Sequence, residues 1–351
     1  MNNSDEHMLA RDLEHILLNT QNIWDDLAGK DIFITGGTGF YGCWLLESLI
    51  HANRRLNLNT RITVLTRNPD AFAKKAPHLA HNPSVRLIAG DVRSFDFPPG
   101  SFSHIIHAAT DTDSGFYSDP IEIIKTIVDG TRHTLEFACH CGAKKFLFTS
   151  SGAVYGKQPY ELSHLPEEYM GGPNPVDTSA AYAEAKRMAE QLCVLYSTRH
   201  DIAVKIARGF AFVGPYMAEN AHFAIMNFIR DGVSGRKIQI RGDGTPCRSY
   251  LYSADLAIWL WTILVRGESR RPYNVGSEKG LSIAELANLV AEALPDSPGV
   301  EILGRPNPGQ PRERYVPSTF RAHSALGLEE HISLLDSIQR TSRWLSKKLS
   351  G

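Results

Sequence analysis

Short apolar runs alternate with longer amphipathic stretches between residue 31 and residue 210. The apolar runs, rich in Ile, Val, Leu and Phe, are typical of β-strands, and the stretches between them carry apolar residues at helical spacing. The predicted strands lie within residues 31–37, 61–67, 85–91, 104–110, 144–151 and 202–210, and the predicted helices within residues 41–53, 121–141 and 181–200. This alternation predicts an α/β fold in which helices cover both faces of a doubly wound parallel sheet.

The segment before the first predicted strand has a helical pattern of its own. Apolar residues from Leu9 to Trp24 recur at helical spacing, which predicts one amphipathic helix over residues 8–27. Because this helix precedes the alternating strands and helices, we expect it to pack against the main fold or to form a contact between subunits.

The alternation of predicted strands and helices ends before Gly214 and Pro215. The remaining chain mixes short helical patterns, short strand patterns and turns rich in proline and glycine, which is typical of a smaller α+β domain. The predicted organisation is an N-terminal helical extension over residues 1–30, a main domain over residues 31–212 to which residues 250–277 return, and a smaller C-terminal domain over residues 213–249 and 278–351.

Composition and charge exclude several classes of protein. The 351 residues carry 37 Lys and Arg against 38 Asp and Glu, a net charge of -1, so no overall positive field attracts nucleic acid or an anionic membrane. No apolar run is long enough to span a membrane, and the N-terminus lacks the apolar core of a secretory signal. The five scattered cysteines predict a reducing, cytoplasmic location without disulfides.

The sequence Cys139-His140-Cys141 does not predict a metal site. The two cysteines are separated by one residue in a predicted helix, so their side chains do not converge on one ion. No metal is therefore expected.

A glycine-rich turn follows the first predicted strand and leads into a helix. Gly36, Gly39 and Gly42 have the spacing Gly-x-x-Gly-x-x-Gly, and Phe40 and Tyr41 lie between the last two. Glycines at such a turn let the backbone approach a pyrophosphate, and the free N–H groups of the helix N-terminus attract the anion. The turn therefore predicts a dinucleotide-binding site.

The residues at the ends of the next two predicted strands bear on the choice of dinucleotide. The second strand does not end in an acid that would bind the ribose 2'-hydroxyl, and Arg67 stands there instead. Because a cation attracts a 2'-phosphate, we expect NAD(P)(H), with NADP(H) favoured. Asp91 and Val92 close the third strand, where the carboxylate can accept a hydrogen bond from the adenine amino group.

A third motif combines hydroxyl groups with a lysine. Ser151 ends the predicted strand over residues 144–151, and Tyr182 and Lys186 follow in the helix over residues 181–200. Residues four apart lie on one helix face, so the Lys186 ammonium can lie beneath the edge of the Tyr182 ring. A neighbouring cation lowers the pKa of a phenol, which makes Tyr182 a candidate general base.

Together these motifs resemble the extended short-chain dehydrogenase/reductase family, in particular its nucleotide-sugar epimerases, dehydratases and reductases, which have a Rossmann main domain. The resemblance is carried by TGGTGFYG, HAAT, SSGAVYG and the pair Tyr182 and Lys186, and it extends over residues 31–345. It implies that Ser151 hydrogen-bonds the reacting sugar oxygen, that Tyr182 transfers the proton and that Lys186 orients the nicotinamide ribose. The further cofactor contacts that it implies are Ala108, Ala109 and Thr149.

The resemblance also implies a nucleoside-diphosphate sugar as the substrate. Arg248 falls in a segment similar to the one with which the family contacts the nucleotide diphosphate, and arginine suits a diphosphate. Arg312 lies in the late loop where the family often supplies a second arginine, as do Arg305 and Arg314. His222, at the start of a predicted helix, is a further candidate for contact with the sugar or base.

A homodimer is the assembly that the resemblance implies. In the family the subunits meet through two neighbouring helices. In this chain the corresponding helices are those predicted at residues 120–141 and 179–199.

Two positions after Ser151 narrow the reaction. Dehydratases of the family usually place an Asp-Glu pair just after the catalytic hydroxyl and its decarboxylases place a Glu nearby, whereas this chain has Gly152 and Ala153, which cannot transfer a proton. The sequence therefore favours hydride transfer at the sugar C4, in a 4-epimerase or a 4-ketoreductase. A 4,6-dehydratase or decarboxylase is disfavoured. A non-catalytic dinucleotide sensor is also disfavoured, because a sensor does not need the Ser151, Tyr182 and Lys186 set.

Overall fold

A seven-stranded sheet runs through the centre of the protein, and all its strands are parallel. The computed structural model describes residues 4–110, 119–218, 223–294, 299–305, 309 and 311–350. In spatial order the strands are β11 (Pro272–Val275), β6 (Ala203–Gly209), β5 (Lys145–Ser151), β4 (His104–His107), β1 (Asp31–Thr35), β2 (Arg61–Thr66) and β3 (Val85–Ala89). The chain order reverses between β1 and β4, as in the doubly wound Rossmann arrangement. The predicted fold class is therefore confirmed.

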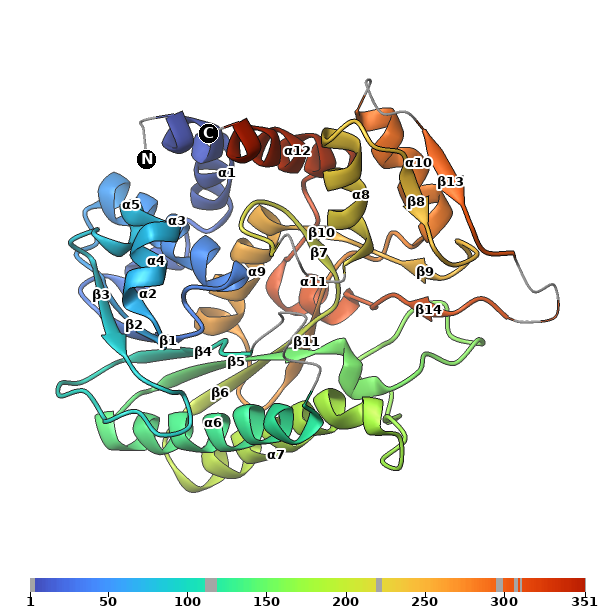
Figure 1. The fold of residues 1–351 in the computed structure, drawn as a ribbon. Helices are drawn as coiled ribbons and strands as arrows, with labels where there is room; N and C mark the ends of the chain where they lie inside the picture. Colours follow the sequence, from blue (N-terminus) through green and yellow to red (C-terminus); the bar gives the residue numbers. More distant parts are fainter. Residues whose placement is uncertain are drawn as a thin grey trace.

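Helices cover both faces of this sheet (Figure 1). They are α3 (Phe40–Leu56) and α9 (Ser253–Arg266) on one face, and α6 (Pro120–Cys141) and α7 (Ala181–Arg199) on the other. Successive residues of β1 point to opposite faces, so Ile32 and Ile34 enter the hydrophobic cluster with α3 and α9, and Phe33 enters the cluster with α6 and α7. Because both faces are covered, the strands appear in the sequence as continuous apolar runs.

The ends of α6 show how the sequence determines a helix boundary. The Asp119 carboxylate accepts hydrogen bonds from the backbone N–H groups of Ile121 and Glu122, and Pro120 occupies the first helical position. At the other end Gly142 adopts a φ of 74°, a left-handed conformation that glycine tolerates and that stops the helix.

The N-terminal segment forms two helices, α1 (Ser4–Asn19) and α2 (Trp24–Leu27). The prediction of one helix over residues 8–27 is therefore wrong. The chain turns at Thr20, whose hydroxyl accepts a hydrogen bond from the indole N–H of Trp24 at 2.9 Å. The turn brings Trp24 against Trp261 of α9, with ring centroids 5.6 Å apart. The two helices thus join the hydrophobic cluster of α3 and α9, the helices that cover one face of the sheet, within the same chain.

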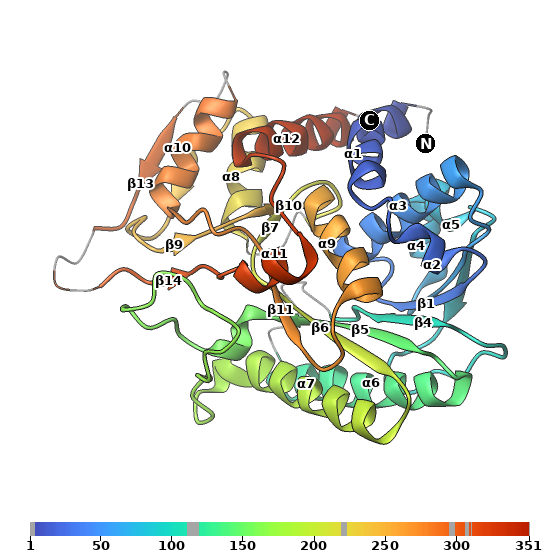
Figure 2. The ribbon, with the colours of Figure 1, turned by 180° about the vertical axis from the view of Figure 1, so that it is seen from behind.

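The remaining elements gather beside the main sheet (Figures 1 and 2). The small sheets are β7 (Phe212–Val213) with β10 (Leu251–Tyr252), β8 (Ile238–Ile240) with β13 (Val300–Ile302), and β12 (Leu281–Ser282), β9 (Cys247–Arg248) and β14 (Arg314–Tyr315). The helices are α8 (Ala224–Val233), α10 (Ile283–Ala293), α11 (Phe320–Leu326) and α12 (Leu334–Ser350). Both views show α12 beside α1, where Arg340 forms an ion pair with Asp12.

Short helices occupy two of the connections, one between β2 and β3 and one between β5 and α7. They are α4 (Pro69–Lys75) and α5 (Pro77–Ala80) between β2 and β3, the 3-10 turn Gly152–Tyr155 after β5, and the 3-10 turn Thr178–Ala180 before α7. Within the residues that the structure describes, no helix is long and apolar enough to cross a membrane. The same residues contain no group of three or more His, Cys, Asp or Glu side chains placed to hold a metal ion.

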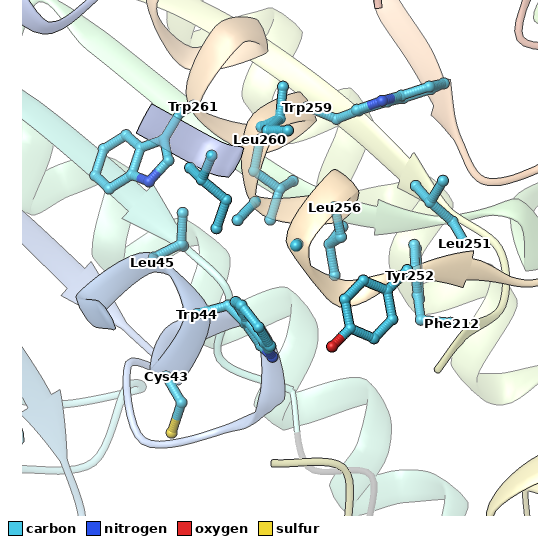
Figure 3. Packing of buried hydrophobic residues seen from close by; sticks show 14 of the residues in the cluster. Cys43, Trp44, Leu45, Phe212, Leu251, Tyr252, Leu256, Trp259, Leu260 and Trp261 are labelled. Carbon is cyan, nitrogen blue, oxygen red and sulfur yellow. The ribbon is translucent and has the colours of Figure 1, made fainter. Parts of the chain in front are cut away.

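Trp261 lies in the cluster between α3 and α9, part of which Figure 3 shows from close by. It is fully buried, and its indole N–H donates to the hydroxyl of Ser48 at 2.8 Å. Replacing Trp261 with Ala leaves a cavity, so we expect the free energy of unfolding in urea to fall by about 3–5 kcal/mol. As a control, Phe320→Ala removes a ring that is 72% exposed and should change this energy by less than about 0.5 kcal/mol. Equal stability of the two variants would contradict the packing described here.

Candidate functional site

A large cleft opens at the carboxyl ends of the parallel strands. Its volume of about 1770 Å³ exceeds the ~300–1,000 Å³ of a pocket for one small ligand, so it has room for two ligands. Residues at the ends of five strands line it, namely Gly36, Arg67, Asp91, Ala108 and Ser151. Ligands of open α/β sheets bind at this edge, beside the point where the strand order reverses.

The cleft is strongly cationic. Among the described residues that line it, Asp91 is the single acid, and the Lys and Arg side chains are Arg67, Lys75, Arg93, Lys186, Arg248, Lys347 and Lys348. Because the whole chain has a net charge of -1, the positive charge is concentrated here. This surplus suits ligands that carry pyrophosphate groups.

The glycine-rich turn has the backbone that close approach to an anion requires. Gly36 has a φ of 72°, and a side chain there would run into the backbone of Ala108. Gly39 immediately precedes α3, and Gly42 lets the first turn of α3 pack against the backbone of Gly37. These features fit a dinucleotide whose pyrophosphate lies at the N-terminus of α3. The predicted cofactor residues that line the cleft are Gly36, Gly39, Phe40, Tyr41, Arg67, Asp91, Val92, Ala108, Ala109, Thr149, Tyr182 and Lys186.

Two basic side chains that the sequence analysis missed line the cleft together with Arg67. Arg93 donates to both carboxylate oxygens of Asp91, at 2.9 and 2.8 Å, and these hydrogen bonds lower the pKa of Asp91. The Asp91 carboxylate, expected to contact adenine, is thus engaged by Arg93. Lys75 donates to the carbonyl of Thr38 in the glycine-rich turn at 2.8 Å. Lys75 and Thr38 lie 37 residues apart in the sequence, so no local pattern predicts their contact.

Lys186 carries an ammonium group that is almost fully buried beside the cleft, with 3% of the residue exposed. Its Nζ donates to the carbonyl of Thr149 and to the hydroxyl of Thr110, each at 2.8 Å. It lies 4.9 Å from the ring centre of Phe148 and 5.9 Å from that of Tyr182. Because α7 places Lys186 one turn after Tyr182, the predicted pair is brought together.

A buried ion pair lies behind Lys186. Burial lowers the pKa of Lys186 to about 7, and the carboxylate of Glu190, one turn further along α7, opposes this shift. Glu190 accepts hydrogen bonds from the Ser150 hydroxyl at 2.6 Å and from the Arg208 guanidinium at 2.9 and 2.6 Å. Arg208 also donates to the Tyr155 hydroxyl at 2.9 Å. The network ties α7 to β5 and β6 directly behind the cleft.

Ser151, the last residue of β5, lines the cleft together with Tyr182 and Lys186. Its Oγ accepts a hydrogen bond from the backbone N–H of Ala153 at 3.1 Å. Tyr315 of β14, which no sequence motif indicated, also lines the cleft, and its hydroxyl lies against Gly152, the residue that follows Ser151. The structure therefore groups hydroxyls and an ammonium where a proton can be held or transferred.

The structure brings one of the predicted substrate arginines to the cleft. Arg248 of β9 lines it, and its guanidinium lies 5.9 Å from the ring centre of Tyr315. Arg312 is exposed and does not line the cleft, because the chain runs along the surface until β14 begins at Arg314. His222 lies outside the described residues.

Comparison with known proteins identifies the family. The model of the NAD dependent epimerase/dehydratase family matches residues 32–276. The chain belongs to this family. UDP-glucuronic acid decarboxylase 6 of Arabidopsis thaliana is 33% identical over 310 residues, which cover 88% of this chain and 86% of that protein. UDP-glucuronic acid decarboxylase 1 of Xenopus tropicalis is 28% identical over 321 residues, which cover 91% of this chain and 73% of that protein.

Solved structures of epimerases share the fold of this member of the family. An epimerase from Methanothermobacter thermautotrophicus has a TM-score of 0.78 at 20% identity, over 95% of this chain and 97% of that one. A UDP-glucuronic acid 4-epimerase from Bacillus cereus has a TM-score of 0.75 at 21% identity, over 91% of this chain and 99% of that one. At these identities the likeness shows the fold alone.

Family membership confirms the resemblance to extended short-chain dehydrogenases/reductases, so the protein is an NAD-dependent enzyme of the nucleotide-sugar group. The choice of reaction stays open between 4-epimerisation and decarboxylation. Gly152 and Ala153 disfavour decarboxylation, whereas the decarboxylase relatives support that reaction at least as well as 4-epimerisation.

The buried Lys186 should titrate far below an exposed lysine, whose pKa is ~10.4. Because burial favours the neutral amine, we expect Lys186 of the dinucleotide-free protein to be charged below pH 7 and neutral above it, with a midpoint at about 7. Labelling with acetic anhydride across a pH series, read for each peptide by mass spectrometry, measures this midpoint against the exposed lysines as internal standard. Labelling of Lys186 in step with those lysines would contradict its buried position.

Proposed function

We propose that this protein transfers a hydride at C4 of a nucleoside-diphosphate sugar, with Ser151, Tyr182 and Lys186 as the catalytic set. The observation that carries the proposal is the buried Lys186 ammonium, held by Thr110 and Thr149 one helical turn from Tyr182. The cleft in which it lies has the volume and the cationic lining for a dinucleotide and a sugar nucleotide together.

Each member of the set has a distinct task. The nicotinamide, when bound, supplies or accepts the hydride. Tyr182 takes the proton of the C4 hydroxyl when the sugar is oxidised and returns it when the ketone is reduced. Lys186 favours the phenolate form of Tyr182 by its charge and can donate to ribose hydroxyls. Ser151 hydrogen-bonds the C4 oxygen and so holds it beside Tyr182.

Decarboxylation is a second candidate, which the relatives favour. It begins with the same C4 oxidation, since a C4 ketone lies β to the C6 carboxylate of a glucuronic acid. When carbon dioxide leaves, the C5–C6 bond breaks and its electron pair moves toward the C4 oxygen. Gly152 and Ala153 favour the other outcome, in which C4 is epimerised or a 4-keto sugar is reduced without a further acid or base.

A product assay tests the proposal and separates these outcomes. The protein is incubated with NAD+ or NADP+ and UDP-glucuronic acid or UDP-glucose, and with NADPH and a UDP-4-keto sugar, and the products are read by mass spectrometry. Loss of carbon dioxide identifies a decarboxylase, a new isomer of equal mass a 4-epimerase, and a gain of two hydrogens a ketoreductase. No turnover with UDP-, dTDP-, GDP- and CDP-sugars would overturn the proposal.

The role of Tyr182 can be tested by removing its hydroxyl alone. Because Tyr182→Phe cannot carry the proton, we expect kcat to fall about 100- to 10,000-fold. Dinucleotide affinity, measured by calorimetry, should stay within about twofold, since the ring and Lys186 remain. Tyr160→Phe, which removes the hydroxyl of a half-exposed ring outside the cleft, is the matched control. A Tyr182→Phe enzyme with the turnover of this control would refute the role.

NADP(H) is the dinucleotide that we propose, on the basis of Arg67 at the end of β2. In addition to Arg67, the basic residues Lys75 and Arg93 line this part of the cleft. Replacing Arg67 with Ala should weaken binding of NADP+ about tenfold more than binding of NAD+, because only NADP+ carries the 2'-phosphate. Arg61→Ala, at the exposed opposite end of the same strand, is the control. An equal effect on both dinucleotides would contradict the assignment.

A homodimer through α6 and α7 is also proposed. The two helices lie side by side on one face of the sheet and expose large apolar side chains, including Ile121, Ile124, Met188 and Leu195. Light scattering should give a dimer for the wild type and a monomer for an Ile121→Glu, Met188→Glu variant. The control Leu303→Glu changes an equally exposed leucine elsewhere and should remain dimeric. A monomeric wild type at micromolar concentration would contradict the proposal.

A further inference from the structure

A tyrosine from the last small strand reaches the catalytic serine. Tyr315 lies in β14, which runs parallel to β9 with Tyr315 opposite Arg248. One face of its ring packs against Phe210, with centroids 4.6 Å apart, and the Arg248 guanidinium lies 5.9 Å from the ring centre. The neighbouring strand pairing and these two contacts hold the ring in one place in the cleft.

The position of Tyr315 explains why residue 152 is glycine. A Cβ atom on Gly152 would lie 2.6 Å from the Tyr315 hydroxyl oxygen and 2.7 Å from Cζ of Phe210. Both distances are shorter than any ordinary contact of a carbon atom. Tyr315 therefore fills the space into which a side chain after Ser151 would project. A carboxylate at position 152 and the Tyr315 hydroxyl cannot coexist in this arrangement.

The hydrogen bonds of Ser151 determine where its proton can point. A serine hydroxyl has one proton to donate and two lone pairs that accept. One lone pair accepts from the backbone N–H of Ala153, and the Tyr315 hydroxyl lies close to the same side chain, against Gly152. Burial raises the pKa of Tyr315 well above its usual range, so the phenol keeps its proton. It can then donate to the second lone pair and leave the serine proton free for a ligand oxygen.

We infer that Tyr315 is a positioning residue, whose hydroxyl orients the Ser151 hydroxyl toward the reacting sugar oxygen. The inference rests on the proposed function of Ser151 and extends it. Tyr315 lies in the C-terminal part of the chain, where β14 pairs with β9. If Tyr315 orients Ser151, this part of the chain contributes to the geometry of the catalytic set. Without Tyr315 the serine would retain only its bond to Ala153, and its hydroxyl could rotate away from the cleft.

The test is a double-mutant cycle with the sugar nucleotide that the product assay identifies. Tyr315→Phe should lower kcat about tenfold or more while KM changes less than about twofold, because the ring remains and only the orientation of Ser151 is lost. Ser151→Ala with Tyr315→Phe should be no slower than Ser151→Ala alone within about twofold, since no hydroxyl remains to orient. Tyr160→Phe, outside the cleft, is the control for the loss of a hydroxyl.

A second variant keeps the test independent of the tyrosine itself. Gly152→Ala pushes the Tyr315 hydroxyl away and should lower kcat to a similar extent, whereas Gly242→Ala, whose added carbon would meet open space, should not. Calorimetry with NADP+ checks that each variant is folded. Full turnover of Tyr315→Phe, or losses that multiply in the double variant, would overturn the inference and leave the proposed function intact. Full turnover of Ser151→Ala would instead overturn the proposed function.

Discussion

The burial of one ammonium group is the constraint on which the catalytic region depends. A lysine removed from water loses its hydration, and burial, partly opposed by the Glu190 carboxylate, lowers the pKa of Lys186 to about 7. The fold offsets this cost with a backbone carbonyl at the end of β5, a hydroxyl after β4 and a carboxylate one turn along α7. These partners come from three different elements, so the position of the lysine is fixed by the way the sheet and α7 pack together.

The carboxylate behind the lysine extends this constraint into the sheet. Glu190 is paired with Arg208, and the pair binds Ser150 on one side and Tyr155 on the other. A buried ion pair adds little net stability, because desolvation of both charges opposes their attraction. Its value here is positional, since it holds the residue next to Ser151 and leaves a negative charge one turn from Lys186. Tyr315, from the C-terminal part of the chain, adds a further hydroxyl to the cleft next to Ser151.

Local patterns were sufficient to predict the strands, the main helices and the pair Tyr182 and Lys186, because those features depend on periods of two residues and one helical turn. Contacts between distant segments could not be predicted in this way. The packing of Trp24 against Trp261 and the hydrogen bond from Lys75 to the glycine-rich turn join segments that are far apart in the sequence. The position of Tyr315 next to Ser151 likewise depends on how the elements pack in three dimensions. The sequence showed that position 152 lacks an acidic side chain. The structure adds the reason, because any side chain there would run into the hydroxyl of Tyr315.

The most direct test of the account is a crystal structure of the Tyr182→Phe variant with NADP+ and UDP-glucuronic acid or UDP-glucose. The account predicts that the ribose hydroxyls beside the nicotinamide lie within hydrogen-bond distance of Lys186 Nζ, and that the C4 oxygen of the sugar lies between Ser151 Oγ and the ring at position 182. A sugar that presents another carbon to the nicotinamide, or a dinucleotide whose ribose lies away from Lys186, would contradict it.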